Sequence, residues 1–570
     1  MRRSNWLLLV AALLAVLAFA AAGCGGDEEE AAPPAAETGA VPAETGGAPV
    51  EPTPPPEEAT EQVLRIAIGA EPPSLDPGLA SDTTSAMIVQ NIGDPLVILG
   101  EDLAPVPALA ESWDVSEDGT VYTFHMRQDG KWTNGDPVTA KDFEYAWKRT
   151  VSPELAADYS YQFYGIVGAA EYNGCDPAKD DCAALADAVG VKAIDDYTFE
   201  VTLTSAQPWF IQQMAHHSFW PVHQATVEQF GDKWTEAENI VTNGPFKLTS
   251  WEHDASMTFE KNPDWRGAAD VALDRIEGVI IVDGTTAVQA FEAGEVDVLD
   301  EQEPVEDIPR LKETPEWQLY PALGTYYYGF NVKNVSDVHQ RRAMALAIDR
   351  TTIVEQVTQA SEIPASGFNP QGMPGFDVIN PASQWLPAGG DIEAAQAELA
   401  QAADVKKKIN LFHNDAPGHK EIAVAIQSMW QPLGLEVTIK AQEWAQFLEF
   451  IGPPPNEAVD VYRLGWIGDF VDAFNFLELW TCESGNNSTN WCNKDFDALV
   501  EQARATPDTD ARYALYAQME QIMFGPEGEV PIAPIYWYTT ANLEKTYVQS
   551  TYNINLLDQK DWTTVVIEPH

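Results

Sequence analysis

Residues 408–466 decide the fold class, and their sequence is KINLFHNDAPGHKEIAVAIQSMWQPLGLEVTIKAQEWAQFLEFIGPPPNEAVDVYRLGW. Its apolar pattern predicts strands over 408–412, 435–439 and 459–466. Helices are predicted between these strands, over 420–433 and 444–450. Strands that alternate with helices in this way are typical of an α/β lobe.

Further helices and strands are predicted outward from this stretch. Helical spacing predicts helices over 338–357 and 394–402, and another that begins at Ala140 with Thr139 as its cap. Strands are predicted over four earlier segments, which are 63–68, 121–126, 198–203 and 257–260. The chain has 570 residues, more than the roughly 250–300 that one core serves, so we expect two or three lobes.

The composition argues against one class of function. The chain has 88 acidic and 32 basic residues, which gives a formal net charge of −56. A nucleic-acid-binding protein needs a basic face that replaces the counterions of phosphate groups. We therefore expect no nucleic-acid partner. The hydrophobic share of 45% is ample for a large globular fold.

The N-terminus has the layout of a secretion signal. Arg2 and Arg3 precede an apolar run, residues 6–22, and small residues end this run just before Cys24. The run is marginal for the roughly 20 residues that a membrane-spanning helix needs, so we interpret residues 1–23 as a signal peptide. Ala-Ala-Gly-Cys also resembles the cleavage motif of bacterial lipoproteins, which implies lipidation of Cys24. We expect a protein outside the cytoplasm, anchored to the outer face of the cell membrane or held in the periplasm.

Residues 24–62 are predicted to be a disordered, acidic tether. After Cys24 this segment is rich in Glu, Ala, Pro, Gly and Thr, and it contains no Lys, Arg or aromatic residue. Such a segment cannot bury enough apolar surface to offset the entropy that ordering removes. We therefore expect the folded part of the chain to begin near Val63.

Four cysteines remain if Cys24 carries lipid. An even number of cysteines outside the cytoplasm suggests disulfides, and four cysteines allow three pairings. The local pairing would close two small loops, between Cys175 and Cys182 and between Cys482 and Cys492. These spacings do not match the paired CxxC motifs of structural zinc sites, so we expect no metal here.

Motifs of several enzyme classes are absent from the sequence. It contains no G-x-x-x-x-G-K-[ST], no G-x-S-x-G and no H-E-x-x-H. His216, His217 and His223 could bind a metal, but no carboxylate or thiol completes the ligand set, and we interpret them as packing or surface residues. Acidic pairs abound, as 88 acidic residues make inevitable. We expect no enzymatic activity, no cofactor and no metal.

Several strings, taken in order, resemble the oligopeptide- and dipeptide-binding proteins of ABC importers. They are EPPSLDP (71–77), DGTVYTF (118–124), KWTNGDPVTAKDF (131–143), TNGPF (242–246), GTYYYGFN (324–331), RRAMALAIDR (341–350), GWIGDF (465–470) and the pair Asn486-Asn487. The resemblance implies an α/β fold of the periplasmic-binding-protein type, in which two lobes close like a clamshell on an extended peptide.

The resemblance also implies the order of the domains. The first lobe would comprise residues 63–90, 241–322 and a C-terminal return over 531–570. An extra subdomain of this lobe would occupy residues 91–240, and the second lobe residues 323–530. The implied partners are a peptide, two permease subunits and separate ATPase subunits, because this chain has no ATPase motif. We expect a monomer that contacts the membrane through the lipid on Cys24.

Charged residues that would meet the ends of a peptide follow from the same resemblance. Asp469 matches the carboxylate that pairs with the peptide α-ammonium, although it could instead cap a helix. Arg463 and His419 align with residues that meet the C-terminal carboxylate of short peptides, a role that suits the fork of an arginine. Both could instead be surface residues.

The remaining predicted site residues are backbone or aromatic partners. Gly465, Trp466 and Ile467 match the strand that hydrogen-bonds the peptide backbone. Trp466 and Trp444 match aromatic residues that line the pocket, with core packing as the alternative. Weaker candidates for ligand binding are Glu71, Tyr161, Tyr164 and Tyr327.

Departures from the family pattern leave the ligand open. The best-known oligopeptide receptors have bonded cysteines where Gly324 and Ile467 stand, and a Glu where Gly329 stands. The loop at 452–455, Gly-Pro-Pro-Pro, leaves no counterpart for a second carboxylate-binding Arg. Peptide length is therefore open, and a non-peptide solute such as an oligosaccharide or a metal chelate is the alternative.

Overall fold

The computed structural model describes residues 61–100, 103–300, 303–380, 385–549 and 555–570. Residues 59–570 form one compact unit. The predicted signal peptide, the lipidation of Cys24 and nearly all of the predicted tether lie outside the described residues. Among the helices that the structure describes, none is long and apolar enough to cross a membrane.

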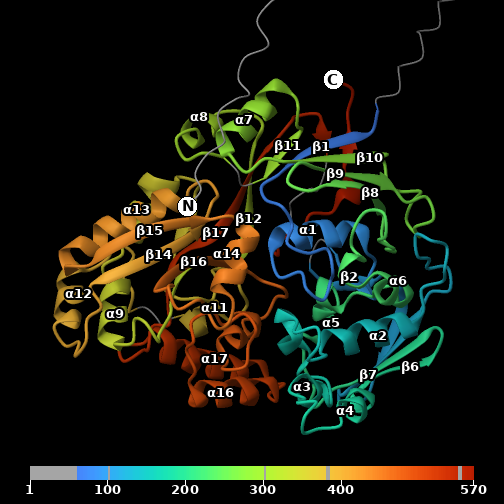
Figure 1. Cartoon of the computed structure of the whole chain (residues 1–570), viewed down its shortest axis with the longest axis horizontal. Coiled ribbons are helices and arrows are strands. Elements are labelled where there is room, and N and C mark those ends of the chain that lie inside the picture. Colours follow the sequence, from blue (N-terminus) through green and yellow to red (C-terminus); the bar gives the residue numbers. More distant parts are fainter. Residues whose placement is uncertain (1–60, 101–102, 301–302, 381–384, 550–554) are drawn as a thin grey trace, which may run out of the picture. The chain divides into compact units, whose positions relative to one another are not determined.

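One mixed sheet runs through both lobes (Figure 1). Its strand order is β15-β14-β16-β12-β17-β11-β1-β10-β9-β8, and β13 pairs with β17. The strands of the second lobe are β12 (Trp317–Phe330), β13 (Ile363–Pro364), β14 (Lys408–Asn414), β15 (Glu436–Gln442), β16 (Val461–Ile467) and β17 (Ile532–Glu544). The strands of the first lobe are β1 (Val63–Ile68), β8 (Phe246–Glu252), β9 (Ser256–Lys261), β10 (Arg275–Ile280) and β11 (Val298–Asp300).

The long strands β12 and β17 belong to both lobes. They pair antiparallel from Gly329–Ile532 to Trp317–Leu543, while β12 also pairs with β16 and β17 with β11. Their register shifts between Pro321 and Thr325, at the predicted lobe boundary. Proline lacks the N–H that a ladder needs, which explains an irregularity at this point.

Strand β17 begins at Ile532, next to residue 531, where the return of the chain to the first lobe is predicted. Ile532, Ala533 and Tyr536 on the first half of β17 are buried in the core of the second lobe. Leu543, near the end of the strand, is buried in the first lobe. The chain therefore changes lobe within β17, because one continuous strand serves both halves of the sheet.

The stretch 408–466 folds as its pattern predicted. Strand β14 pairs parallel with both β15 and β16. Helices α13 (His419–Trp430) and α14 (Trp444–Ile451) connect these strands. Ile422, Ile426 and Trp430 place the apolar face of α13 in the core, as the helical spacing required.

The single helix predicted over 338–357 is wrong. Helix α9 (Val338–Leu346) ends early, and α10 (Arg350–Thr352) continues into a wider turn over Ile353–Thr358. Asp349 caps the second helix by accepting from the backbone N–H of Thr352 at 2.9 Å. Arg350 is fully buried and donates through Nε to the carbonyl of Pro534 at 2.7 Å, which fixes the break against β17.

The predicted extra subdomain has its own sheet and core. Strands β4 (Ala110–Val115), β5 (Val121–Met126), β7 (Thr198–Thr202) and β6 (Val191–Asp195) form a four-stranded antiparallel sheet in that order. Helix α2 (Ala140–Thr150) covers it, and Asp142 accepts from the backbone N–H of Thr139 at its start. Phe143 and Trp147 on this helix pack against Phe199 on the sheet. The domain boundaries themselves stay a prediction.

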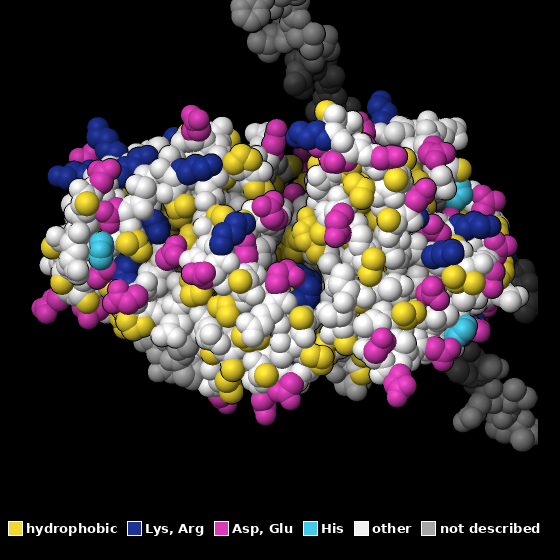
Figure 2. Space-filling view, turned by 90° about the horizontal axis from the view of Figure 1, so that it is seen from below, with side chains coloured by type: hydrophobic (Ala, Val, Ile, Leu, Met, Phe, Trp, Pro, Cys, Tyr) yellow, Lys and Arg dark blue, Asp and Glu magenta, His cyan; other side chains and the backbone are white. Residues whose placement is uncertain are grey.

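Both disulfides join cysteines that are near in sequence. Cys175 bonds to Cys182 in the extra subdomain, and Cys482 bonds to Cys492 in the second lobe. Of the three possible pairings, the structure contains the local one. Acidic side chains are scattered over the whole face shown in Figure 2, with fewer basic ones between them, as the net charge of −56 requires.

Candidate ligand-binding site

A cavity of about 420 Å³ lies between residues of the two lobes. The first lobe contributes the start of helix α1 (Thr83–Ile92) and Asp82 before it, and the extra subdomain contributes Tyr159 and His216. The second lobe contributes the starts of α13 and α14 and the end of β16. This volume is in the range of small-molecule binding sites, which are about 300–1,000 Å³.

Asp469 follows β16 after Gly468 and lines this cavity. Its carboxylate is 7% exposed. Gln162 and Asn475 donate side-chain N–H groups to Oδ2, both at 2.7 Å. On the other oxygen, Tyr159 donates its hydroxyl at 3.3 Å, and His216 Nε2 lies at 3.2 Å. The carboxylate is therefore fixed by donors from both lobes.

No lysine or arginine of the described chain forms an ion pair with Asp469; the one ion-pair contact there is His216. Burial and the charge of Asp469 raise the pKa of Tyr159 well above its ordinary value, so this phenol stays protonated and acts as a donor. A buried carboxylate without a permanent cation is unfavourable, since water no longer solvates it. The position suits a cation brought by a ligand.

Strand β16 presents an unpaired backbone edge to the cavity. On one side, β12 pairs with β16 along its whole length, from Val461 to Ile467. On the other side, β14 pairs with Val461 and Tyr462 alone, so in the described structure Arg463–Ile467 have no neighbouring strand there. These five residues line the cavity. Gly465 leaves room for Tyr538, because a Cβ at this position would collide with the Tyr538 hydroxyl.

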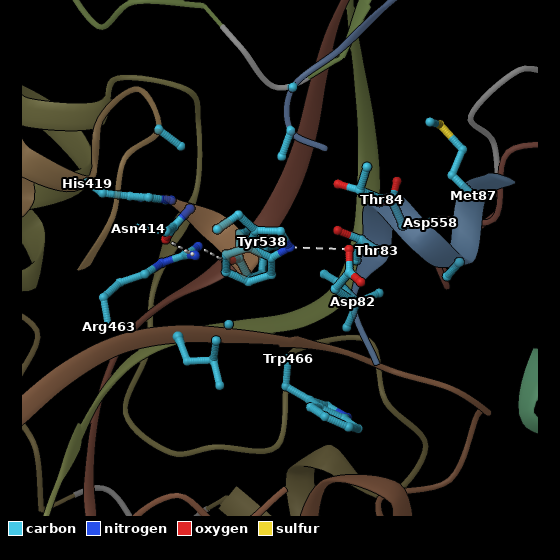
Figure 3. A pocket seen from close by; sticks show the side chains of 18 of the residues that line it. Asp82, Thr83, Thr84, Met87, Asn414, His419, Arg463, Trp466, Tyr538 and Asp558 are labelled. Carbon is cyan, nitrogen blue, oxygen red and sulfur yellow. Dashed lines mark hydrogen bonds between the residues drawn. The ribbon is translucent and has the colours of Figure 1, made fainter. Parts of the chain in front are cut away.

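Arg463 lies on β16 with Asn414 and His419 beside it (Figure 3). Its side chain donates to Asn414 Oδ1 at 3.1 Å and to the Tyr538 hydroxyl at 3.0 Å. The guanidinium is 4.4 Å from the centre of the Tyr326 ring, a cation–π contact. Nε is buried without a hydrogen-bond partner, and no carboxylate of the described residues forms an ion pair with this arginine.

His419 begins α13 and lies 3.2 Å from the Tyr326 hydroxyl through Nδ1. Burial, and then the positive charge of Arg463, hold the pKa of His419 well below its ordinary value. The imidazole is therefore neutral, and Arg463 supplies the positive charge at this end of the cavity.

Two tryptophans complete the predicted set in the cavity wall. Trp466 is buried and donates through Nε1 to Asn475 Oδ1 at 3.1 Å. The same Asn475 donates to the carboxylate of Asp469. Trp444 at the start of α14 donates to Asp82 Oδ1 at 3.2 Å, a contact between the lobes. One cavity is thus lined by Asp469, Arg463, His419, Trp444 and residues 465–467. The roles of these residues toward a ligand stay predictions.

Four predicted residues lie outside the cavity wall. Glu71 accepts from Trp251 and from the backbone of Asp254 on the surface of the first lobe. Tyr161 lies behind Tyr159, with its ring centre 6.0 Å away, and Tyr164 donates to Asn173. Tyr327 packs against Phe368 and Trp480 in the core. Alternation along β12 places Tyr326, rather than Tyr327, on the side of Arg463.

Several residues that line the cavity or hold Asp469 were missed by sequence reasoning. Asp82 has the sequence signature of a helix cap, and nothing local shows that its helix begins at a cavity. His216 was interpreted as a packing or surface residue, yet it contacts Asp469. Gln162 and Asn475 are single polar residues whose meeting with Asp469 depends on tertiary structure. Across the described residues, no group of three or more His, Cys, Asp or Glu is placed to hold a metal ion.

Comparisons with known proteins agree on one family. The family model described as bacterial extracellular solute-binding proteins, family 5 Middle, matches residues 104–488. The oligopeptide-binding protein OppA of Bacillus subtilis is 36% identical over 495 residues, which cover 84% of this chain and 87% of that protein. The structure of Haemophilus influenzae OppA in complex with RPPGFSPFR is 29% identical, covers 90% of this chain and 99% of its own, and superposes with a TM-score of 0.82.

The predicted fold class is confirmed by these structural neighbours. One of the similar solved structures is an unliganded open form. The unliganded open form of MppA, a periplasmic murein tripeptide binding protein, is 30% identical, covers 90% of this chain and 98% of its own, and reaches a TM-score of 0.60. The structure thus superposes better on the peptide complex than on the unliganded open form.

Proposed function

Because this chain belongs to the bacterial extracellular solute-binding proteins of family 5, we propose that it captures peptides outside the cytoplasm and delivers them to an ABC importer. The observation that carries the proposal is Asp469, a buried carboxylate in the cavity wall that no lysine or arginine of the described residues pairs with. The α-ammonium of a peptide would supply that charge. Asp469 is therefore assigned to the amino end of the ligand.

The free edge of β16 supports a peptide rather than another solute. A peptide that lies beside Arg463–Ile467 adds a strand to the sheet, so its backbone forms hydrogen bonds that do not depend on sequence. The space beside this edge belongs to the same cavity as Asp469. A peptide bound there would extend from Asp469 along β16 toward Arg463.

Arg463 is assigned to the carboxylate of a short peptide. It is a buried guanidinium that stacks on Tyr326 and has an unused Nε–H group. A peptide carboxylate would pair with this charge, as guanidinium forks commonly do. The neutral His419 beside it would add a hydrogen bond but no charge. A longer peptide would have to pass this residue, so we expect short peptides to bind more tightly.

The proposed transport role extends to the N-terminal segment and to the closure of the lobes. The proposal includes cleavage before Cys24 and a lipid on its thiol, so that residues 24–62 would connect the receptor to the membrane near the permease. Closure of the lobes around a peptide would create the form that docks on the permease subunits, with separate ATPases driving import. Ligand binding favours the closed state through contacts that both lobes make in that state alone.

Mass spectrometry of ligands that co-purify with the protein tests the proposal. We expect peptides among them, and we expect calorimetric titration of the emptied protein with tri- to pentapeptides to show saturable binding. A sugar or a metal chelate as the co-purified ligand, together with no binding of any peptide, would overturn the peptide assignment and leave a receptor for another solute.

A further inference from the structure

The cavity differs in charge from one end to the other (Figure 3). Asn414, His419 and Arg463 lie on one side of Tyr538 in this view. Asp82 and Asp558 lie on the other, beside the threonines that begin α1. Arg463 thus lies at one end and Asp82 and Asp558 at the end formed by the first lobe, while Glu362 and Lys560 also line the cavity.

Asp82 and Asp558 are not equivalent. Asp558 forms an ion pair with Lys560 at 2.9 Å, so its charge is already compensated. Asp82 forms no ion pair with any residue that the structure describes. Its Oδ1 caps α1 by accepting from the backbone N–H of Ser85 at 3.1 Å, and it also accepts from Trp444.

The second oxygen of Asp82 is unused. Oδ2 is buried and has no hydrogen-bond partner, although the residue lines the cavity and is only 8% exposed. Burial raises the pKa of Asp82, and the hydrogen bonds from Ser85 and Trp444 offset only part of that effect. A cation in the cavity at this point would stabilise the ionised carboxylate.

A second carboxylate belongs to the same part of the wall. Asp158 also lines the cavity, and its carboxyl interacts with the side chain of Ser81, the residue before Asp82. Burial raises the pKa of Asp158 as well. Two desolvated carboxylates that no lysine or arginine of the described chain pairs with thus share one region, apart from the Asp469 that is assigned to the α-ammonium.

We propose that Asp82, with Asp158 beside it, forms a second cation site that takes the ammonium or guanidinium group of a lysine or arginine side chain in the bound peptide. This inference rests on the proposed function and deepens it, since it names a preferred class of peptide. A cation there would offset the charge of Asp82, whose Oδ2 has no hydrogen-bond partner. The receptor is then selective for basic peptides, although its backbone contacts are not selective for sequence.

Paired peptides test the site. Alanine tripeptides carry either lysine or Nε-acetyl-lysine at each position in turn, and calorimetry measures both affinities. We expect at least one position where wild type prefers lysine by about tenfold or more, the scale of a hydrogen bond to a charged group. Asp82→Asn should abolish this preference and stay folded, because asparagine retains the capping oxygen that Ser85 and Trp444 use.

The matched control is Asp283→Asn. Asp283 caps the ten-residue helix α7 (Gly284–Ala293) and accepts from the backbone of Thr286, as Asp82 does for the ten-residue α1, but it does not line the cavity. We expect this variant to keep the lysine preference. Equal affinity for lysine and acetyl-lysine peptides at every position of the wild type, or an unchanged preference in Asp82→Asn, would overturn the cation site.

Two further outcomes separate this inference from the proposed function. Peptides that bind without any preference for lysine would remove the cation site and leave the peptide receptor intact. Spermidine that binds wild type and fails to bind Asp82→Asn, with no peptide bound by either, would support the cation site and overturn its assignment to a peptide side chain.

Discussion

Glu478 is a buried carboxyl group whose protonation is influenced by the charge of Asp469. Glu478 is 1% exposed and has Arg504 Nη2 at 3.4 Å as its ion-pair partner. Burial raises the pKa of Glu478 to about 8; Arg504 opposes this rise and the charge of Asp469 adds to it. A neutral Glu478 therefore belongs to the folded state at neutral pH, behind the carboxylate that the ligand is proposed to meet.

Glu478 is expected to make stability depend on pH. The unfolded chain releases this proton near 4.5 and the folded protein near 8, so the folded form binds more protons between these values. The contribution of Glu478 to the free energy of unfolding is full below the unfolded pKa and is lost as pH rises through about 8. Glu478→Gln stays neutral throughout, so its thermal midpoint should rise relative to wild type from about pH 5 to 9. Thermal midpoints of the two proteins that change with pH by the same amount would contradict this prediction.

Arg463 should distinguish peptides by their carboxyl ends. We expect Arg463→Gln to weaken the binding of a tripeptide with a free carboxylate by about tenfold or more, because a charged hydrogen bond is lost. Binding of the matching C-terminal amide should change much less in the same variant. Calorimetry with both peptides measures the two ratios, and an equal loss for acid and amide would assign Arg463 to structure alone.

At the scale of elements, β16 brings the site together. One short strand carries Arg463 and the free backbone edge, and Asp469 follows it after Gly468. Its other edge pairs with β12, which continues into the first lobe. The site therefore depends on where the pairing with β14 stops, after Tyr462.

The free edge of β16 predicts how modified peptides bind. N-methylation of one backbone amide removes a donor without changing charge, so we expect alternate positions of a peptide to lose about tenfold in affinity. Positions between them should tolerate the methyl group, since alternate N–H groups of an added strand point away from β16. Titration with a series of singly methylated peptides measures this pattern. Uniform tolerance along the series would argue against strand addition.

Periodicity predicted those elements whose pattern is local. Strands β14 and β16 and the start of α2 at Thr139 follow from spacing and capping alone. The break at Asp349 was missed, because Asp349 lies inside a segment with continuous helical spacing and Arg350 is fixed by a carbonyl on β17. Tyr327 lies away from the cavity wall, because alternation gives two faces without saying which one meets the cavity. The sequence around Asp82 predicts a helix cap, and nothing in it predicts that the residue also lines the cavity.

For the molecule as a whole, aromatic and hydrogen-bond contacts join the two lobes. Trp209 of the extra subdomain stacks on Phe474 of the second lobe, with ring centres 4.6 Å apart. Trp444 of the second lobe donates to Asp82 of the first. Both contacts join residues of different lobes, and the one made by Trp444 lies in the cavity wall.

Closure should be visible in solution. We expect the radius of gyration from X-ray scattering to fall when a tripeptide is added to the emptied protein, because the peptide contacts both lobes only in the closed form. Trp444→Phe keeps the ring and loses the hydrogen bond to Asp82, so it should need more peptide for the same compaction. A radius that does not change with saturating peptide would contradict the clamshell mechanism for this chain.

The central claim is that Asp469 neutralises the α-ammonium of a bound peptide, and N-acetylation of the peptide tests it most directly. Calorimetry would compare a free tripeptide with its N-acetyl form on wild type and on Asp469→Asn, after thermal unfolding has shown that the variant is folded. We predict that wild type prefers the free amine by about a hundredfold, and that the variant loses most of this preference. Equal affinity of wild type for the free and acetylated peptides would contradict the claim.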